Sequence, residues 1–344
     1  MTTSIKEKIT YRCGKQLDFA RLKSNVLEDP AAYLKQIEKR VALYKNPRAL
    51  VKVKNCYICG SKGPFNPVLK VWDVTFVQCP VCTHTFLPAR ISDKAMEEFY
   101  RKNKFYAATY ANADANLYRK ENVAKPKVEH VLDIAGAGRA LRWLDVGTGT
   151  GEIVAVLREK GIEAYGLELS KHSVEFAKRA YGLDLIPQTL QQYSKQKPQL
   201  FDVISFMGVL EHVADPVNTL GAAVKLLKKG GYIAAEVPNF NCFSTRVQAA
   251  FPRNVIRHAE PLGHMQLFTE QSMKYALRRF KLVPRNIWYF GMDMHELIFN
   301  LTIQDPSFAG HPIRHSLYES LNDLQGIIDR SKLSDEFLVV AQKK

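Results

Sequence analysis

Apolar and polar positions are patterned most clearly between Arg142 and Ser170, where the chain predicts a strand, a helix and a second strand. The apolar run Trp143–Val146 is typical of a buried strand. Apolar residues then recur at helical spacing up to Gly161, at Ile153, Val154, Val156 and Leu157. A second apolar run, Ala164–Leu167, ends in the carboxylate of Glu168. This order indicates a strand–loop–helix–strand unit of an α/β sheet.

The loop between the first strand and the helix carries three glycines, Gly147, Gly149 and Gly151. Glycine lets the backbone bend sharply and approach a ligand closely. A dinucleotide-binding loop has the spacing GxGxxG and places a pyrophosphate at the helix N-terminus. Here the spacing is GxGxG, and Glu152 at the mouth of the helix would repel a pyrophosphate. The pattern therefore favours a positively charged ligand without phosphate, such as S-adenosylmethionine (SAM). A glycine-rich turn with no ligand is the alternative.

Two stretches resemble motifs of the class I SAM-dependent methyltransferases. LDVGTGTGE (144–152) looks like motif I, and FDVISFMGVLEHV (201–213) looks like the motif after the fourth strand, with the LEH signature at 210–212. The resemblance runs from about residue 56 to the end. It places Glu168 at a strand tip, where a carboxylate can accept hydrogen bonds from both ribose hydroxyls. The cofactor-binding residues that we expect are Asp145, Gly147, Thr148, Gly149, Gly151, Glu168, Leu169, Thr189, Leu190, Met207, Gly208, Val209, His212 and Tyr106.

Further strands and helices complete the expected fold. Strands are predicted at Leu185–Ile186, from Phe201, at Tyr232–Val237, at Leu282–Tyr289 and at Glu336–Ala341. With the two strands above, these runs predict an α/β fold. The resemblance implies that residues 141–344 form the Rossmann-like, seven-stranded sheet of a class I methyltransferase, with Glu336–Ala341 as its antiparallel last strand. A helical insertion is predicted at about 291–333. It could cover the active site or form an oligomer contact.

Four cysteines form two CxxC pairs, Cys56 with Cys59 and Cys79 with Cys82, separated by nineteen residues. This spacing is typical of a four-thiolate zinc site. The intervening apolar runs predict strands, so residues 56–90 are expected to form a small zinc ribbon. Four thiolates leave no open coordination position, so the zinc is expected to be structural. A redox pair or a motif without metal are the alternatives.

Two other segments complete the predicted domain organisation. Residues 1–55 predict a mostly helical N-terminal segment, including a helix that opens at Pro30. Residues 91–140 predict helices with an aromatic-rich stretch that includes Tyr106, which could pack in the core or form a lid over the cofactor. A ribbon, an aromatic segment and a SAM motif in this order resemble a group of bacterial methyltransferases that often act in sugar, polysaccharide or natural-product pathways.

Composition says more about the cellular environment of the protein than about the reaction that it catalyses. The formal net charge of +15 favours an anionic partner, although scattered lysines and arginines on an ordinary basic surface explain it equally well. No apolar run reaches membrane-spanning length and the N-terminus has no apolar signal core, so we expect a cytoplasmic protein. In a reducing compartment the CxxC pairs favour metal over disulfides. The oligomeric state stays open, and a homodimer is possible.

Histidines supply the candidate catalytic groups. Methyl transfer is an in-line displacement that depends mainly on positioning, and a hydroxyl acceptor also needs a general base, usually histidine. The resemblance places His264 on the substrate loop facing the active site, and we prefer it as the base. His212 follows the LEH motif and fits a structural role or the methionine end of SAM better than catalysis; His258 is a third possibility. Three arginines of the same loop could hold a phosphate or simply be solvated: Arg246, Arg253 and Arg257.

The sequence therefore predicts a zinc-containing SAM methyltransferase that acts on a hydroxyl of a nucleotide- or phosphate-linked sugar. Methylation of a quinone-like or phenolic metabolite is the alternative, because the LEHV motif is shared with such enzymes; C-methylation of a keto sugar is a variant. An RNA methyltransferase or a nucleic-acid-binding module that uses the ribbon is a further alternative. No aromatic-plus-basic stacking motif of the known RNA-binding types supports it. A protein that binds SAM without transferring its methyl group stays possible.

Overall fold

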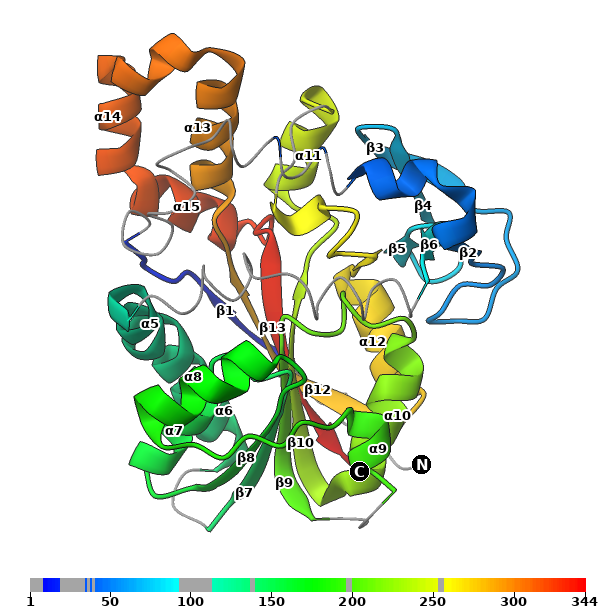
Figure 1. The fold of residues 1–344 in the computed structure, drawn as a ribbon, viewed down its shortest axis with the longest axis vertical. Coiled ribbons are helices and arrows are strands. Elements are labelled where there is room, and N and C mark those ends of the chain that lie inside the picture. The colour runs from blue at the N-terminus through cyan, green and yellow to red at the C-terminus, as the bar shows by residue number, and fades with distance from the viewer. Residues whose placement is uncertain are drawn as a thin grey trace, which may run out of the picture.

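Seven strands form the central sheet of the computed structural model, which describes residues 9–18, 35, 38, 41–92, 113–136, 140–195, 200–252 and 257–344. Their order is β1–β12–β13–β10–β9–β7–β8 (Figure 1). Six strands run parallel, and β13 lies antiparallel between β10 and β12. Their bounds are β1 Thr10–Cys13, β7 Arg142–Val146, β8 Glu163–Leu167, β9 Phe201–Met207, β10 Leu227–Pro238, β12 Leu282–Phe290 and β13 Glu336–Lys343. The predicted fold class is confirmed.

The seventh strand is not the one that the sequence predicts. At Leu185–Ile186 the chain forms only an isolated bridge, from Ile186 to Leu167. The opposite edge is instead extended by β1, within the N-terminal segment that was expected to be mostly helical. The Arg12 guanidinium lies 4.0 Å from the centroid of the Trp288 ring, and the Gly14 amide donates to the Tyr289 carbonyl. All four residues of β1 are exposed, so the strand carries no apolar signature and depends on its partner strand.

Helices cover both faces of the sheet (Figure 1). One face carries α5 (Ala113–Arg119), a π-helical turn (Lys120–Ala124), α6 (Lys125–Ala135), α7 (Glu152–Glu159) and α8 (Lys171–Tyr181). The other carries α9 (Leu190–Tyr193), α10 (Pro216–Leu226) and α12 (Glu270–Arg278). The helix starts follow local chemistry: Asp215 caps α10 ahead of Pro216, and Thr269 caps α12.

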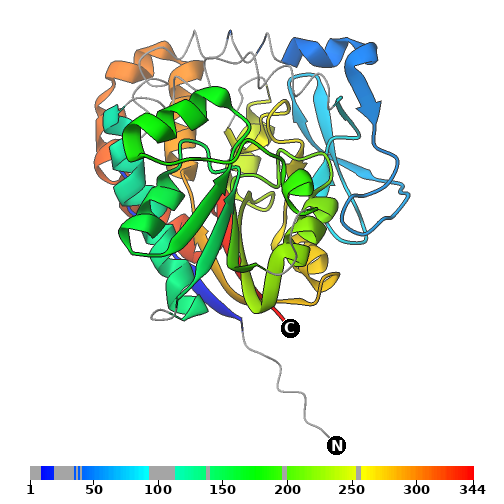
Figure 2. The ribbon, with the colours of Figure 1, turned by 60° about the horizontal axis from the view of Figure 1, so that its bottom comes forward.

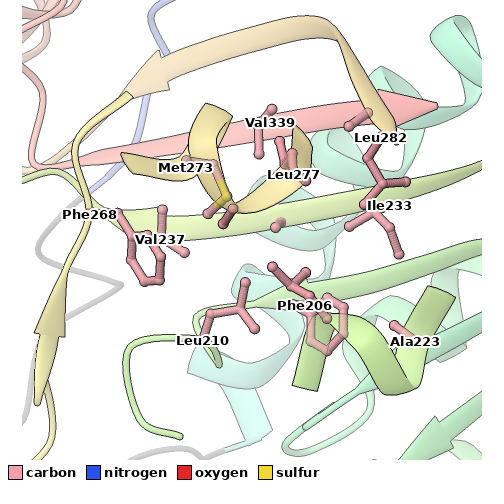
Figure 3. Close-up of a cluster of buried hydrophobic side chains, with 14 of the residues drawn as sticks. Phe206, Leu210, Ala223, Ile233, Val237, Phe268, Met273, Leu277, Leu282 and Val339 are labelled. Atoms are coloured by element: carbon pink, nitrogen blue, oxygen red, sulfur yellow. The ribbon is translucent and has the colours of Figure 1, made fainter. Parts of the chain in front are cut away.

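Alternation along the strands divides the core in two. Trp143 of β7 packs toward α6 and α7, whereas Leu144 faces the other side. Figure 3 shows that second side, where α12 presents Met273 and Leu277 to side chains of β10 and β13 such as Val237 and Val339. Strand side chains alternate with a period of two, so both helical layers are held by the same strands.

The cysteine-rich segment forms the predicted ribbon and shares its core with the main body. Its sheet contains β3 (Asn66–Val71), β4 (Val74–Gln78), β5 (Thr85–Phe86) and β11 (Gln266–Leu267), in the order β11–β5–β4–β3. Strand β11 comes from the loop before α12. Strands β2 (Leu50–Lys52) and β6 (Ala89–Ile91) pair beside it, with the 3₁₀ turns η1 (Ala42–Lys45) and η2 (Pro47–Ala49). Because Ile58 and Phe86 belong to the same apolar cluster as β9 and β10, the ribbon is fused to the sheet rather than tethered to it.

Helices between β12 and β13 occupy the predicted insertion. They are α13 (Asp293–Gln304), η5 (Pro306–Gly310), α14 (Pro312–Glu319) and α15 (Leu321–Arg330). With α11 (Phe243–Ala250) and η4 (Arg257–Ala259), they follow the carboxyl ends of parallel strands. Figure 2 shows the insertion and the ribbon on opposite sides of this end of the sheet. Within the described ranges, no helix is both long and apolar enough to cross a membrane.

Candidate active site

The cofactor half of the site is the loop after β7 together with the tip of β8. Gly147, Gly149 and Gly151 all have positive φ, at 67°, 58° and 89°. The Gly149 amide donates to Oε2 of Glu168 at 2.9 Å, and the Ser170 amide donates to Oε1 at 2.7 Å. Burial raises the pKa of the Glu168 carboxyl, against the opposing effect of these two hydrogen bonds. The sequence-predicted loop and carboxylate are therefore brought together.

Gly147 also marks the close approach of two loops at the carboxyl edge. A Cβ at this position would lie 2.8 Å from Cγ2 of Val209, which belongs to the loop after β9. In that loop Gly208 has φ of 69°, and its amide donates to the Glu236 carbonyl of β10 at 3.2 Å. Val209 and its predicted neighbours Met207 and Gly208 thus line the edge directly beside motif I.

Asp145 lies under the loop. It is 1% exposed and accepts a hydrogen bond of 2.5 Å from the Ser205 hydroxyl, which in turn accepts from the indole nitrogen of Trp143. Burial raises the pKa of Asp145 to about 6. In this structure its carboxyl group ties β7 to β9 from within the core. Thr148, of the same predicted set, is also buried.

Side chains from α5, which the sequence did not single out, compensate the charge of Glu152. Its Oε1 accepts from Asn116 Nδ2 at 2.8 Å and from the Thr150 hydroxyl at 2.8 Å, and it lies 3.4 Å from Nε of Arg119. Tyr181 of α8 donates to Asn116. No local motif in 113–119 signals this role, because the contacts span more than thirty residues.

Three of the predicted cofactor-binding residues, Leu169, Thr189 and Leu190, are spread over two short segments. Leu169, next to Glu168, is 60% exposed. Thr189 caps α9 through a reciprocal capping box with Gln192, and Leu190 is buried in the core. The Leu190 side chain thus has little surface to offer, whereas Leu169 presents an apolar surface at the edge. Tyr106 lies outside the described residues.

The second half of the site contains the two predicted catalytic histidines, His212 and His264, and we call it the acceptor half after their predicted role. The rings of His212 and His264 have centroids 4.8 Å apart in an edge-to-face arrangement. Nδ1 of His212 lies 2.8 Å from the Gly263 carbonyl oxygen, and Nδ1 of His264 lies 2.8 Å from the His258 carbonyl oxygen. His258, the third candidate, is buried with Nε2 2.9 Å from the Thr245 hydroxyl. Of the three arginines, Arg246 lies on α11, whereas Arg253 and the side chain of Arg257 are outside the described part of the chain.

The ribbon holds this half in place through one glutamine. Gln266 Oε1 lies 2.9 Å from Nε2 of the buried His84, and its Nε2 donates to the Val213 carbonyl. The hydroxyls of Thr83 and Thr269 lie 2.6 Å apart beside this contact. The loops after β9 and before α12 are therefore both bound to the ribbon through hydrogen bonds.

The four ribbon cysteines fit a zinc ion. Sγ of Cys56 lies 3.5 Å from Sγ of Cys82, Cys59 and Cys79 are separated equally, and all four sulfurs lie within 4.8 Å of one another. Tetrahedral zinc with bonds of about 2.3 Å needs sulfurs about 3.8 Å apart. The hydrogen bond from Cys82 lowers the pKa of the Cys56 thiol, so one thiolate is already favoured. None of the six cysteines, all of which the structure describes, forms a disulfide.

Comparison with known families matches residues 94–284 to a methyltransferase domain. Because this match covers more than half of the 344 residues, the chain belongs to that family. Its sheet and motif I make it a class I SAM-dependent methyltransferase domain, as the sequence resemblance implied.

Two curated relatives are ubiquinone biosynthesis O-methyltransferases. The protein from Vibrio atlanticus is 35% identical over 120 residues, which are 33% of this chain and 51% of the relative. That from Vibrio cholerae is 31% identical over 121 residues, 33% of this chain and 49% of the relative. The chain thus spans about half the length of these relatives. A SAM-dependent methyltransferase structure from Archaeoglobus fulgidus overlaps with a TM-score of 0.45 at 15% identity, over 65% of this chain and 94% of that one, and adds nothing to the family assignment.

Proposed function

We propose that this protein transfers a methyl group from SAM to a hydroxyl of a small acceptor. The observation that carries the proposal is the position of Glu168 directly after β8, where its two carboxylate oxygens accept from the amides of Gly149 and Ser170. Each oxygen accepts one backbone hydrogen bond and can accept at least one more. Glu168 therefore suits the two ribose hydroxyls of SAM.

The surrounding loop also fits SAM better than a dinucleotide. The charge of Glu152 is compensated by Asn116 and Arg119, so this carboxylate is a fixed part of the helix start. A pyrophosphate bound at this helix start would have to displace the Glu152 carboxylate from these two partners. At Gly149 a Cβ would meet nothing within 4 Å, which leaves space beside the backbone. We propose that Leu169 packs on the adenine and that Met207–Val209 line the methionine end.

The acceptor half supplies a proton acceptor. When bound, SAM would supply a methyl group carried on a positively charged sulfur. The acceptor oxygen would attack the methyl carbon in line with the departing sulfur. His264 Nδ1 donates to the His258 carbonyl, so Nε2 is the nitrogen that can accept a proton. We propose that His264 takes the hydroxyl proton and that His212 orients the acceptor.

Calorimetric titration with SAM and its demethylated product tests the cofactor assignment. We expect Glu168→Ala to weaken SAM binding about 100-fold, since two hydrogen bonds to a charged group contribute about 3 kcal/mol together. Glu163→Ala is the matched control, because Glu163 lies at the start of the same strand and pairs with Arg142 on the surface. No binding to the wild type, or equal loss in both variants, would refute the SAM site.

The acceptor class is a sugar hydroxyl in our proposal, on a nucleotide- or phosphate-linked sugar. The basic balance of the chain and Arg246 on α11, which follows the carboxyl end of β10, support an anionic acceptor. A second candidate is a quinone-like phenol, favoured by the names of the two curated relatives. Methyl transfer from labelled SAM to nucleotide sugars, to catechols and to RNA separates these classes. Transfer to RNA alone, lost steeply with salt, would overturn both.

We also propose that the ribbon binds one structural zinc ion through Cys56, Cys59, Cys79 and Cys82. Thiolate ligands of this kind persist in a reducing compartment, which supports a cytoplasmic location. Metal analysis of protein purified without chelator tests the site. Less than one zinc per chain would contradict it.

A further inference from the structure

Three metal-ligating side chains converge at the acceptor half of the site, apart from the ribbon cysteines. They are Glu211 and His212, after β9, and His264, before β11. One donor atom from each lies within 4.8 Å of the other two. Donors bound at about 2.1 Å to a common ion lie up to about 4.2 Å apart, so small side-chain rotations would complete a site. Nε2 of His212 is already 3.7 Å from Oε1 of Glu211.

The two histidines are held in the tautomer that a metal ligand needs. A carbonyl oxygen only accepts hydrogen bonds, so the Nδ1 atoms that lie 2.8 Å from the carbonyls of Gly263 and His258 must carry the protons. The lone pair of each ring is therefore on Nε2. Metal-binding histidines characteristically donate their other N–H to a carbonyl or carboxylate in this way.

The backbone around the three side chains is fixed as well. The Met265 amide donates to the Glu211 carbonyl at 3.1 Å, which joins the two ligand-bearing segments. The Gly263 amide donates to Oε2 of Glu260 at 2.8 Å, and a Cβ at Gly263 would lie 2.9 Å from that oxygen. A larger residue at this position would have to displace the Glu260 carboxylate, and the Gly263 carbonyl is the one that orients His212. Such outer contacts hold ligands ready for an ion.

We propose that Glu211, His212 and His264 bind a first-row divalent metal ion, and that its open positions take the acceptor hydroxyl. Two imidazoles and one carboxylate are a ligand set typical of Mn²⁺, Fe²⁺, Co²⁺ or Zn²⁺ with open coordination positions. Glu211 is 3% exposed, and a divalent ion would oppose the charge of this buried carboxylate. One carboxylate and two neutral rings leave the bound ion with a net charge of +1, which suits a deprotonated oxygen. A vicinal diol or catechol, with two adjacent oxygens, would be the preferred acceptor.

This inference rests on the proposed methyl transfer for the acceptor's role and refines the part of His264. The metal lowers the pKa of the coordinated hydroxyl, whose proton leaves to solvent. The acceptor oxygen then forms the bond to the methyl carbon, and the carbon–sulfur bond breaks with its electron pair going to sulfur. With the ion bound, His264 is a ligand and water replaces it as the acceptor of the hydroxyl proton, so His264 acts as the base only when the ion is absent.

The test of the site is Mn²⁺ binding to the whole protein, measured by equilibrium dialysis and by electron paramagnetic resonance. Mn²⁺ prefers nitrogen and oxygen ligands to thiolates, so the ribbon should not take it up. We expect one Mn²⁺ per wild-type chain and binding at least ~10-fold weaker in Glu211→Gln and His264→Ala. His315→Ala is the matched control, because His315 is an exposed histidine that also pairs with a glutamate, Glu319. Zinc content gives a second readout, with two ions per chain in the wild type and in His315→Ala, and one per chain in Glu211→Gln and His264→Ala.

The outcomes separate the metal site from the methyl transfer. Absence of Mn²⁺ uptake together with one zinc per wild-type chain overturns the metal site, and so does binding that all three variants share. If the ion binds but methyl transfer persists after its removal, the ion's role in acceptor binding is refuted while the methyltransferase stands. If the wild type does not bind SAM, the proposed methyl transfer is refuted, whereas the Mn²⁺ result still stands. Unchanged SAM affinity in Glu211→Gln shows that this variant is folded.

Discussion

The two halves of the site are built in different ways. In the cofactor half, Gly149, Glu168 and Ser170 meet within about twenty residues of one another, and the contacts run between a backbone and one carboxylate. In the acceptor half, His84 reaches Gln266 across 182 positions, and His212 contacts the Gly263 carbonyl across 51. The first half is local and close to motif I, whereas the second is assembled by the ribbon. Damage to the ribbon should therefore separate the two.

The largest expected effect comes from removing one ribbon thiolate. In Cys79→Ser we expect loss of zinc, a lower melting temperature and at least a 100-fold fall in methyl transfer, because structural zinc contributes folding free energy directly. SAM affinity should change much less, since motif I makes its contacts without the ribbon. Zinc analysis, thermal melting and calorimetry measure the three quantities.

Cys13→Ser is the matched control, because Cys13 is exposed and far from the CxxC pairs in sequence. It should leave zinc content and methyl transfer unchanged. An equal fall in SAM affinity and methyl transfer in Cys79→Ser would show that the two halves of the site depend equally on the ribbon.

A smaller effect is expected from the buried carboxyl group under the cofactor loop. The folded-state pKa of Asp145, about 6, lies above its usual value of 3.8. The folded state therefore binds more protons between these values, and stability should fall by about 2–3 kcal/mol as the pH rises from 3.8 to 6, then stay level. Denaturant unfolding across this range measures the slope. The free energy of unfolding of Asp145→Asn minus that of the wild type should rise over the same pH range, because the variant lacks the titrating carboxyl group. A difference that does not change with pH would mean that Asp145 has the same pKa in the folded and unfolded states.

The smallest expected effect is on the free energy of unfolding of two glycine variants, and it separates a steric contact from backbone strain. Gly147→Ala and Gly161→Ala both place alanine at positive φ, but only at Gly147 does the new Cβ meet a neighbour, Val209. We expect Gly147→Ala to destabilise by about 1–2 kcal/mol more than Gly161→Ala, because overpacking adds to the strain. Val209→Ala in the Gly147→Ala background should recover part of the difference. Equal unfolding free energies for the two glycine variants would show that the loops are not pressed together.

The residues and elements that were not predicted show which features a sequence pattern cannot reveal. The glycine loop, Glu168, the LEH motif and the CxxC pairs are predictable because each depends on residue type at fixed short spacing. Strand β1 was missed because its four exposed residues have no apolar alternation. Asn116 and Arg119 were missed because they are ordinary helix residues whose role comes from the distant Glu152.

Residue patterns were enough to predict the α/β class, the glycine loop followed by Glu168, and the two CxxC pairs of the ribbon, since hydrophobic periodicity and ligand spacing are local properties. The antiparallel direction of the last strand was predicted from the resemblance to class I methyltransferases. The three-dimensional packing alone shows that the ribbon shares a core with the sheet, that β1 completes the sheet edge and that His264 meets Glu211 and His212. Those contacts join segments dozens to hundreds of residues apart. Their geometry is set by how strands and helices pack, which short-range spacing does not encode.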